Sequence, residues 1–243
     1  PDVPEDPEIA KVFRPLREQR NTALEQIVGE ALTPFTAKGT PHGLTATAAL
    51  LRAAIAEAVR ADIVLHGQLT NAELEVGPVR ERHVWRLVPY EDHIAVAWLT
   101  FAELREILEE AAGHWNSPSF LGSRGVHYVL HPEAPLGSRI GPMTLPDGTT
   151  PPPDRRFKVA FNSYTAASAG LRHAVLRRVI RQPEAQPELT PVEVREALRA
   201  YIRQHSPLTA PADSAEGVRL EPKKNSPSAT ISEPPQTNPT VTK

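Results

Sequence analysis

The sequence of 243 residues contains no cysteine and a single methionine, Met143. Without cysteine the chain can form no disulfides, iron–sulfur clusters or thiolate zinc sites. Aromatic residues make up only 5% of the chain, so each ring carries more information than usual. No apolar run approaches the roughly 20 residues that cross a bilayer, and we predict no membrane span. What remains is a globular composition, with 40% hydrophobic residues to build a core.

The chain also lacks an excess of charge of either sign. Its formal net charge is −2 and its isoelectric point is about 6.6. Arginines gather over residues 172–181, but a near-neutral chain has no general attraction to nucleic acid, so we predict no nucleic-acid partner. The sequence begins with Pro1 rather than methionine. We therefore expect a processed or excised piece of a longer precursor.

Hydrophobic periodicity predicts both helices and strands. Apolar residues at helical spacing, with charges on the other face, predict a long helix over about residues 7–25. Alternating or continuous apolar runs predict strands, and several of them lead directly into helical patterns. Helices and strands are intermixed without a regular βαβ rhythm. This favours an α+β fold, with a mixed sheet and packed helices.

Local signals suggest where two later helices begin. Thr100 and Glu103 have the spacing of a capping box at the end of a strand. Thr190 has the same relation to Glu193, with Pro191 in the first turn, so we expect a helix to start there.

The composition divides the chain into three parts. Residues 1–25 form the long helix, which we interpret as a linking helix, and residues 26–205 form the main domain. From about residue 206 the chain is rich in proline, serine and threonine and poor in apolar residues. This composition predicts a disordered tail over residues 206–243.

The stretch FKVAFNSYTAASAGLRHAV, residues 157–175, joins a predicted strand to a predicted helix. Small residues around Ser168 resemble the turn that exposes a nucleophilic serine in α/β-hydrolases. His173 follows, but the nearest acid in the required role, Asp213, falls in the predicted tail. An independent serine hydrolase that uses Ser168 is therefore the less favoured alternative.

Nine histidines raise the question of a metal site. No His-Glu-x-x-His motif occurs. His127 and His131 flank a strand segment that would separate them by about 13 Å. We predict no metal site and no catalytic residue in this chain.

One resemblance covers about residues 7–205. The strand Ala61–Leu65 is followed by Gly77-Pro78-Val79, and a short helix ends in Pro89-Tyr90. The segment Leu99–Leu104 is similar to a Leu-Thr-Gly-x-Glu-Leu unit, and Asn162-Ser163-Tyr164 lies where an Asn-x-Phe segment is expected. In this order the elements resemble the C-terminal domain of the 5'-nucleotidase family, which comprises two-domain metallophosphoesterases of the periplasm or cell surface.

The resemblance implies a division of labour between two domains. In that family the N-terminal domain carries the pair of divalent metals and the catalytic groups, which this chain would lack. The C-terminal domain binds the nucleotide or nucleoside-like substrate between two aromatic rings. Carried over by position, the rings are Phe120 and Tyr164, and the polar contacts are Asn162 and Asn71. The resemblance also implies a periplasmic or extracellular location and a role in nucleotide catabolism.

The polar signature differs from the family pattern. Asn71 stands where the family has an arginine, and Ser168-Ala169-Gly170 replaces a turn that carries an aspartate. Phe120 and Tyr164 can equally be core residues. A diverged, non-catalytic binding or interaction module of the same fold is therefore a second interpretation.

Overall fold

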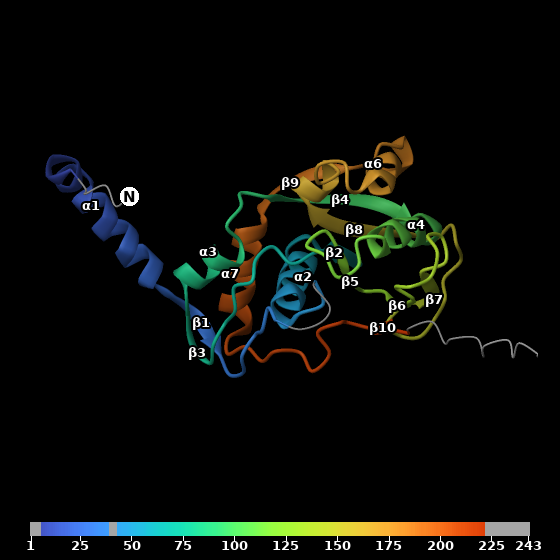
Figure 1. Cartoon of the computed structure of the whole chain (residues 1–243), viewed down its shortest axis with the longest axis horizontal. Coiled ribbons are helices and arrows are strands. Elements are labelled where there is room, and N and C mark those ends of the chain that lie inside the picture. Colours follow the sequence, from blue (N-terminus) through green and yellow to red (C-terminus); the bar gives the residue numbers. More distant parts are fainter. Residues whose placement is uncertain (1–5, 39–42, 222–243) are drawn as a thin grey trace, which may run out of the picture.

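The computed structural model describes residues 6–38 and 43–221. It begins with helix α1 (Pro7–Glu25), as predicted; the Asp6 carboxylate caps the helix by accepting from the amides of Glu8 and Ile9. No residue of α1 is buried. Figure 1 shows α1 extending away from the rest of the molecule. Strand β1 (Ile27–Ala31) follows and pairs antiparallel with β3 (Gly77–Arg80).

The centre of the molecule is a mixed sheet of five strands in the order β5-β2-β8-β4-β9. Strands β2 and β8 run parallel, and the other neighbours run antiparallel. The bounds of these strands are Gly122–Arg124 for β5, Ile63–His66 for β2, Arg156–Asn162 for β8, His93–Thr100 for β4 and Glu188–Glu193 for β9. The predicted α+β class with a mixed sheet is confirmed.

Side chains alternate across this sheet and divide the core into two parts. On β4, Ala95, Ala97 and Leu99 pack into one cluster, while Ile94 and Val96 pack into the other. Helices on the two faces complete these clusters. They are α2 (Ala46–Val59) and α7 (Val194–His205) on one face, and α4 (Phe101–Ala112) and α6 (Ala174–Ile180) on the other.

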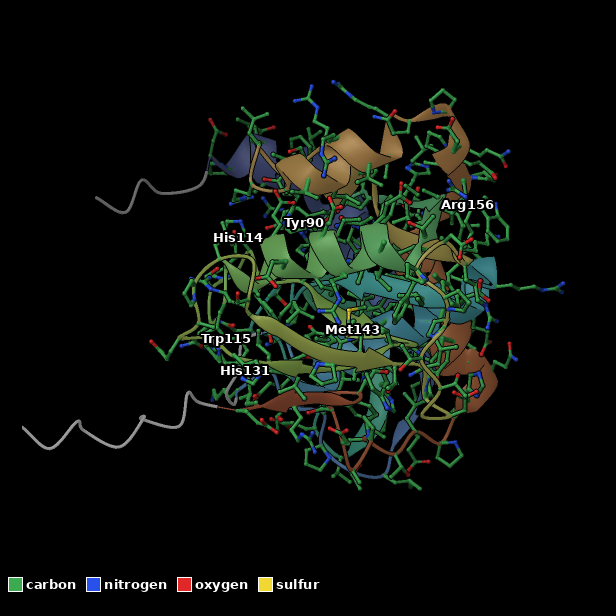
Figure 2. All side chains as sticks on the ribbon, turned by 90° about the vertical axis from the view of Figure 1, so that its right-hand side faces the viewer. Tyr90, His114, Trp115, His131, Met143 and Arg156 are labelled. Carbon is green, nitrogen blue, oxygen red and sulfur yellow. The ribbon has the colours of Figure 1, made fainter. Side chains whose placement is uncertain are left out.

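A second, three-stranded sheet lies beside the first core cluster in the order β10-β6-β7. Figure 2 shows Met143 of β7 beneath α4, and its side chain is buried. The bounds are Val218–Leu220 for β10, His127–Leu130 for β6 and Ile140–Thr144 for β7; the remaining short helices are α3 (Glu81–Leu87), α5 (Ser163–Ala166) and η1 (Pro183–Ala185).

The prediction of a disordered tail is wrong for residues 206–221. Strand β10 pairs parallel with β6, and Leu208 and Val218 are buried. The buried guanidinium of Arg52 donates from Nε to the Glu216 carboxylate at 2.6 Å. Residues 222–243 lie outside the described residues.

One of the two predicted helix starts is confirmed. Thr100 caps α4, and the Glu103 carboxylate accepts from the Thr100 amide at 2.7 Å. The other prediction is wrong, because Thr190 lies within β9 and α7 begins only at Val194. The Thr190 hydroxyl donates to the Ile94 carbonyl at 2.8 Å, which commits this segment to pairing with β4.

Candidate functional site

A pocket of about 450 Å³ opens where the parallel strands β2 and β8 end. Its wall includes His66, the last residue of β2, and Asn162, the last residue of β8. The loops that follow parallel strands diverge from the sheet edge, and crevices at such carboxyl ends are common ligand sites. The segments that follow β2, α3 and β8 and the loop before β5 contribute the other residues of the wall.

Asn162 holds two parts of the pocket together. It caps the short helix α5, because its side-chain oxygen accepts from the Thr165 amide at 2.9 Å. Its side-chain nitrogen donates to Oδ2 of Asp92 at 3.0 Å. The Ser163 hydroxyl donates to Oδ1 of the same carboxylate, also at 3.0 Å. Asp92 is thereby fixed in the pocket wall by two hydrogen bonds, one from the last residue of β8 and one from the first residue of α5.

Two tyrosine rings line the pocket and remain open to solvent. Tyr90, labelled in Figure 2, is 56% exposed, and Tyr164 is 51% exposed. Arg172 lies beside the second ring, donating to the Tyr164 hydroxyl at 2.6 Å with its guanidinium carbon 5.8 Å from the ring centroid. The pocket therefore combines aromatic faces, a carboxylate and a guanidinium group.

The turn that carries Arg172 has an unusual backbone. Ser168, Ala169, Gly170 and Leu171 all have positive φ, with values of 80°, 45°, 72° and 72°. Residues other than glycine adopt this region at a cost, and such strain is concentrated at functional sites. Burial of Ser168 and Ala169 holds the turn in place at the pocket edge.

Two buried histidines stand in the pocket wall. Burial lowers the pKa of His66 to about 4, although its hydrogen bond to the Gly67 carbonyl acts in the opposite direction. Because Nδ1 must donate to that carbonyl, Nε2 carries the lone pair, and it has no hydrogen-bond partner. Burial, aided by His114 and Arg172, likewise lowers the pKa of His173 to about 4.

The predicted site residues have different positions. Tyr164 and Asn162 both line the pocket. Phe120 does not, because its ring is 1% exposed and packs edge-to-face against Trp115 in the core, with the centroids 5.3 Å apart. Asn71 is exposed outside the lining and accepts a hydrogen bond from Gln68 at 3.2 Å.

Sequence reasoning missed Tyr90 and Asp92 as members of the site. The signal was present in Pro89-Tyr90, since a ring just beyond the proline that ends a helical pattern need not enter the core. Sequence alone did not bring this segment next to Asn162, because residues 90–92 and 162–164 are far apart along the chain. The link is the pairing of β4 with β8, which aligns Ile94 with Asn162.

Ser168 does not have the properties of a nucleophile. Its side chain is fully buried, and its hydroxyl has no hydrogen-bond partner. Catalytic serines need an accessible hydroxyl next to a base. The geometry therefore argues against the serine hydrolase alternative.

Neither a metal cluster nor a membrane helix is found within residues 6–38 and 43–221. No group of three or more histidine, aspartate or glutamate side chains there is arranged to hold a metal ion. No helix in the same ranges is long and apolar enough to span a bilayer.

The fold of this chain also occurs as one part of longer proteins. The structure is similar to a 5'-nucleotidase precursor from Thermus thermophilus, with a TM-score of 0.74 and 20% identity over 90% of this chain and 44% of that chain. For the NAD nucleotidase of Haemophilus influenzae the TM-score is 0.72, with 13% identity over 90% of this chain and 42% of that chain.

A third similar structure is the sulfate thiohydrolase SoxB, also from Thermus thermophilus, with a TM-score of 0.64 and 16% identity over 90% of this chain and 39% of that chain. The chain thus spans less than half the length of these proteins. Comparison with curated protein sequences gave no significant match. The family model described as "5'-nucleotidase, C-terminal domain" matches residues 24–175. The chain belongs to this family.

Proposed function

We propose that this chain recognises the substrate for a 5'-nucleotidase-like phosphoester hydrolase that acts in nucleotide catabolism. The observation that carries the proposal is the pocket itself, in which the exposed rings of Tyr90 and Tyr164 accompany the fixed Asp92 carboxylate. Aromatic faces bind any nucleobase by stacking, and polar groups beside them orient it. Arg172 supplies a positive charge at the same pocket for an anionic part of the ligand.

In this proposal the chemistry takes place on a separate N-terminal metallophosphoesterase domain. That domain would bring a pair of divalent metals, which can activate water and stabilise the phosphoryl group. This chain would hold the nucleoside end and present the phosphate, and helix α1 would join the two domains. The family resemblance also supports a periplasmic or extracellular location.

Calorimetric titration of nucleosides and nucleotides onto the chain tests the proposal. We expect saturable binding of at least one nucleoside monophosphate. We also expect no release of phosphate from these nucleotides when Mn²⁺ or Zn²⁺ is added and no other domain is present. A folded protein that binds no nucleoside or nucleotide would refute the proposal.

The absence of binding would favour the second interpretation, a diverged binding or interaction module of the same fold. Two observations favour that alternative. Asn71 brings no charge to the place where the family pattern has an arginine. The same fold also occurs in a sulfate thiohydrolase, so the fold does not by itself require a nucleotide ligand.

A further inference from the structure

The hydrogen bonds around Asp92 restrict which ring the pocket can hold. We propose that the pocket selects rings that present two adjacent N–H donors, and that the Asp92 carboxylate accepts a hydrogen bond from each of them. Guanine is the nucleobase of this kind. This proposal rests on the proposed function, because it presumes that a nucleobase enters between Tyr90 and Tyr164.

The first step is the orientation of the carboxylate. Ser163 Oγ accepts from the His93 amide at 3.3 Å, so its single proton is available for Asp92 Oδ1. Asn162 is also unable to turn around, because its oxygen caps α5 through the Thr165 amide. Both donors to Asp92 are therefore fixed by backbone contacts, and the carboxylate is held in one orientation.

The second step is the bonding capacity that remains. A carboxylate has about four lone-pair positions and donates no hydrogen bond at neutral pH. Ser163 and Asn162 use one position on each oxygen. The two bonds leave one acceptor position on each oxygen, and because Asp92 belongs to the pocket wall, we place these two positions toward the ligand. Such a pair of acceptors matches two parallel N–H groups on one edge of a ring.

The third step compares the bases. Guanine presents N1–H and the 2-amino group side by side, which satisfies both oxygens. Adenine presents an amino group beside the N1 lone pair, and that lone pair would face a carboxylate oxygen. Unpaired or opposed polar groups in a desolvated site carry a large penalty. His66 adds a further acceptor to the wall, because its buried Nε2 has no partner.

Calorimetry on the unaltered chain provides the first test. GMP, IMP and AMP are titrated at one salt concentration. Since one bidentate base contact changes affinity by about one to two powers of ten, we expect GMP to bind about tenfold or more tightly than AMP. IMP keeps N1–H but lacks the 2-amino group, so its affinity should fall between the two.

The Asp92→Asn variant provides the second test. An amide offers one donor and one acceptor, so the preference for GMP should disappear and AMP should bind equally well or better. Glu91→Gln is the matched control, because it removes the same charge at the adjacent exposed position, outside the pocket lining. It should leave the ratio of GMP to AMP affinity unchanged. Thermal melting shows that each variant is folded.

The outcomes separate this proposal from the proposed function. If nucleotides bind but AMP equals or exceeds GMP on the unaltered chain, the guanine preference is refuted and the proposed function stands. If the preference exists but persists in folded Asp92→Asn, then Asp92 does not read the base and the proposal is refuted. If no nucleotide binds, both proposals are refuted. The ligand series alone decides the matter should the variant fail to fold.

Discussion

Asn162 contributes both to the fold and to the site. Its side chain caps helix α5 and also donates to Asp92, so the start of a helix and the orientation of a pocket carboxylate depend on one amide. Because the side-chain oxygen makes the helix cap and the side-chain nitrogen makes the contact with Asp92, a substitution that alters either atom removes one of these two interactions. Aspartate at position 162 would keep the cap, but it would place two carboxylates side by side and repel Asp92.

The two exposed rings should determine nucleotide affinity. Tyr90→Ala and Tyr164→Ala are each expected to weaken binding by about 1–3 kcal/mol, because each removes one stacking face. Trp98→Ala is the matched control, since Trp98 is also exposed, at 41%, but does not line the pocket. Calorimetry measures all three. Equal affinities for the tyrosine variants and the parent chain would contradict stacking.

Phe120 should behave as a core residue. Phe120→Ala is expected to lower the free energy of unfolding by about 3–5 kcal/mol, because a buried ring in contact with Trp115 would leave a cavity. Urea unfolding measures this loss. A variant with unchanged stability and reduced nucleotide affinity would instead place the ring at the ligand.

His66 should make stability depend on pH. Its pKa is about 4 in the folded state because of burial and about 6.5 when exposed. In the unfolded chain His66 therefore binds a proton below about pH 6.5, whereas in the native state it binds one only below about pH 4. Stability is constant above that window and falls as the pH drops through it, by on the order of 3 kcal/mol.

Urea unfolding at pH 7 and pH 4.5 tests this dependence. In the variant His66→Asn, whose amide can still donate to the Gly67 carbonyl, the decline over this interval should be smaller than in the parent chain. Part of the decline should remain, because the pKa of His173 is lowered in the same way. An identical decline in the free energy of unfolding between pH 7 and pH 4.5 in both proteins would show that His66 does not titrate as described.

At the scale of elements, the segment after α7 has a larger role than its composition predicts. Arg52 is fully buried, and it donates to Glu216 and to the Ser214 carbonyl at 3.1 Å. These contacts and strand β10 bring residues 206–221 onto α2 and β6. The segment therefore satisfies a buried charge that the rest of the chain would leave without its carboxylate.

Two truncations compare the ordered segment with the residues beyond it. Ending the chain after His205 should cost several kcal/mol: about 3–5 for the unpaired Arg52, and about 1.5–3 for each of Leu208 and Val218. Ending it after Glu221 keeps these contacts and serves as the control. Thermal melting compares the two. Equal melting temperatures for the two truncated chains would show that residues 206–221 do not stabilise the fold.

Elements whose signals are local were predictable from the sequence. The strand and helix joined at Thr100 were found because the cap, the capping partner and the periodicity all lie within a few residues. The start of α7 was misplaced because Thr190 has a cap-like neighbourhood but pairs instead with distant β4. The order of residues 206–221 depends on Arg52, which lies far away along the chain and which no local pattern reports.

The residues of the candidate site also differ in how far the sequence alone could predict their positions. Tyr164 and Asn162 were carried over by position from the family resemblance, and the structure places both in the pocket lining. Phe120 was chosen by position, and its burial could not be judged without the packing of Trp115. Asp92 became visible only when the pairing of β4 with β8 brought it to the Asn162 amide.

At the scale of the whole molecule, α1 differs from every helix that packs on the sheet. None of its residues is buried, whereas ten residues of α2 are. A helix that buries none of its side chains against the rest of the fold is marginally stable. Hydrogen exchange should therefore be fast along most of α1 in the isolated chain and slow in α2. Comparable protection of both helices would show that α1 is stabilised by contacts beyond those described.

The exposed side chains Ile9, Val12, Phe13 and Leu16 share one face of α1. In the proposed arrangement a second domain is attached at the N-terminal end of this helix. Figure 1 shows that end far from the sheet. The body of the chain holds α1 near its other end, where Arg80 donates to the Glu25 carbonyl at 2.9 Å.

In this arrangement a small rotation of α1 about its C-terminal end produces a large displacement of its N-terminal end. Nineteen helical residues span about 28 Å, so a turn of about 30° at Gln26 carries the far end through an arc of about 15 Å. Any looseness in the contact between Arg80 and Glu25 is magnified along that length. In the proposed arrangement, the precision with which a distant catalytic centre meets the pocket would therefore be set by a few atoms where α1 joins β1.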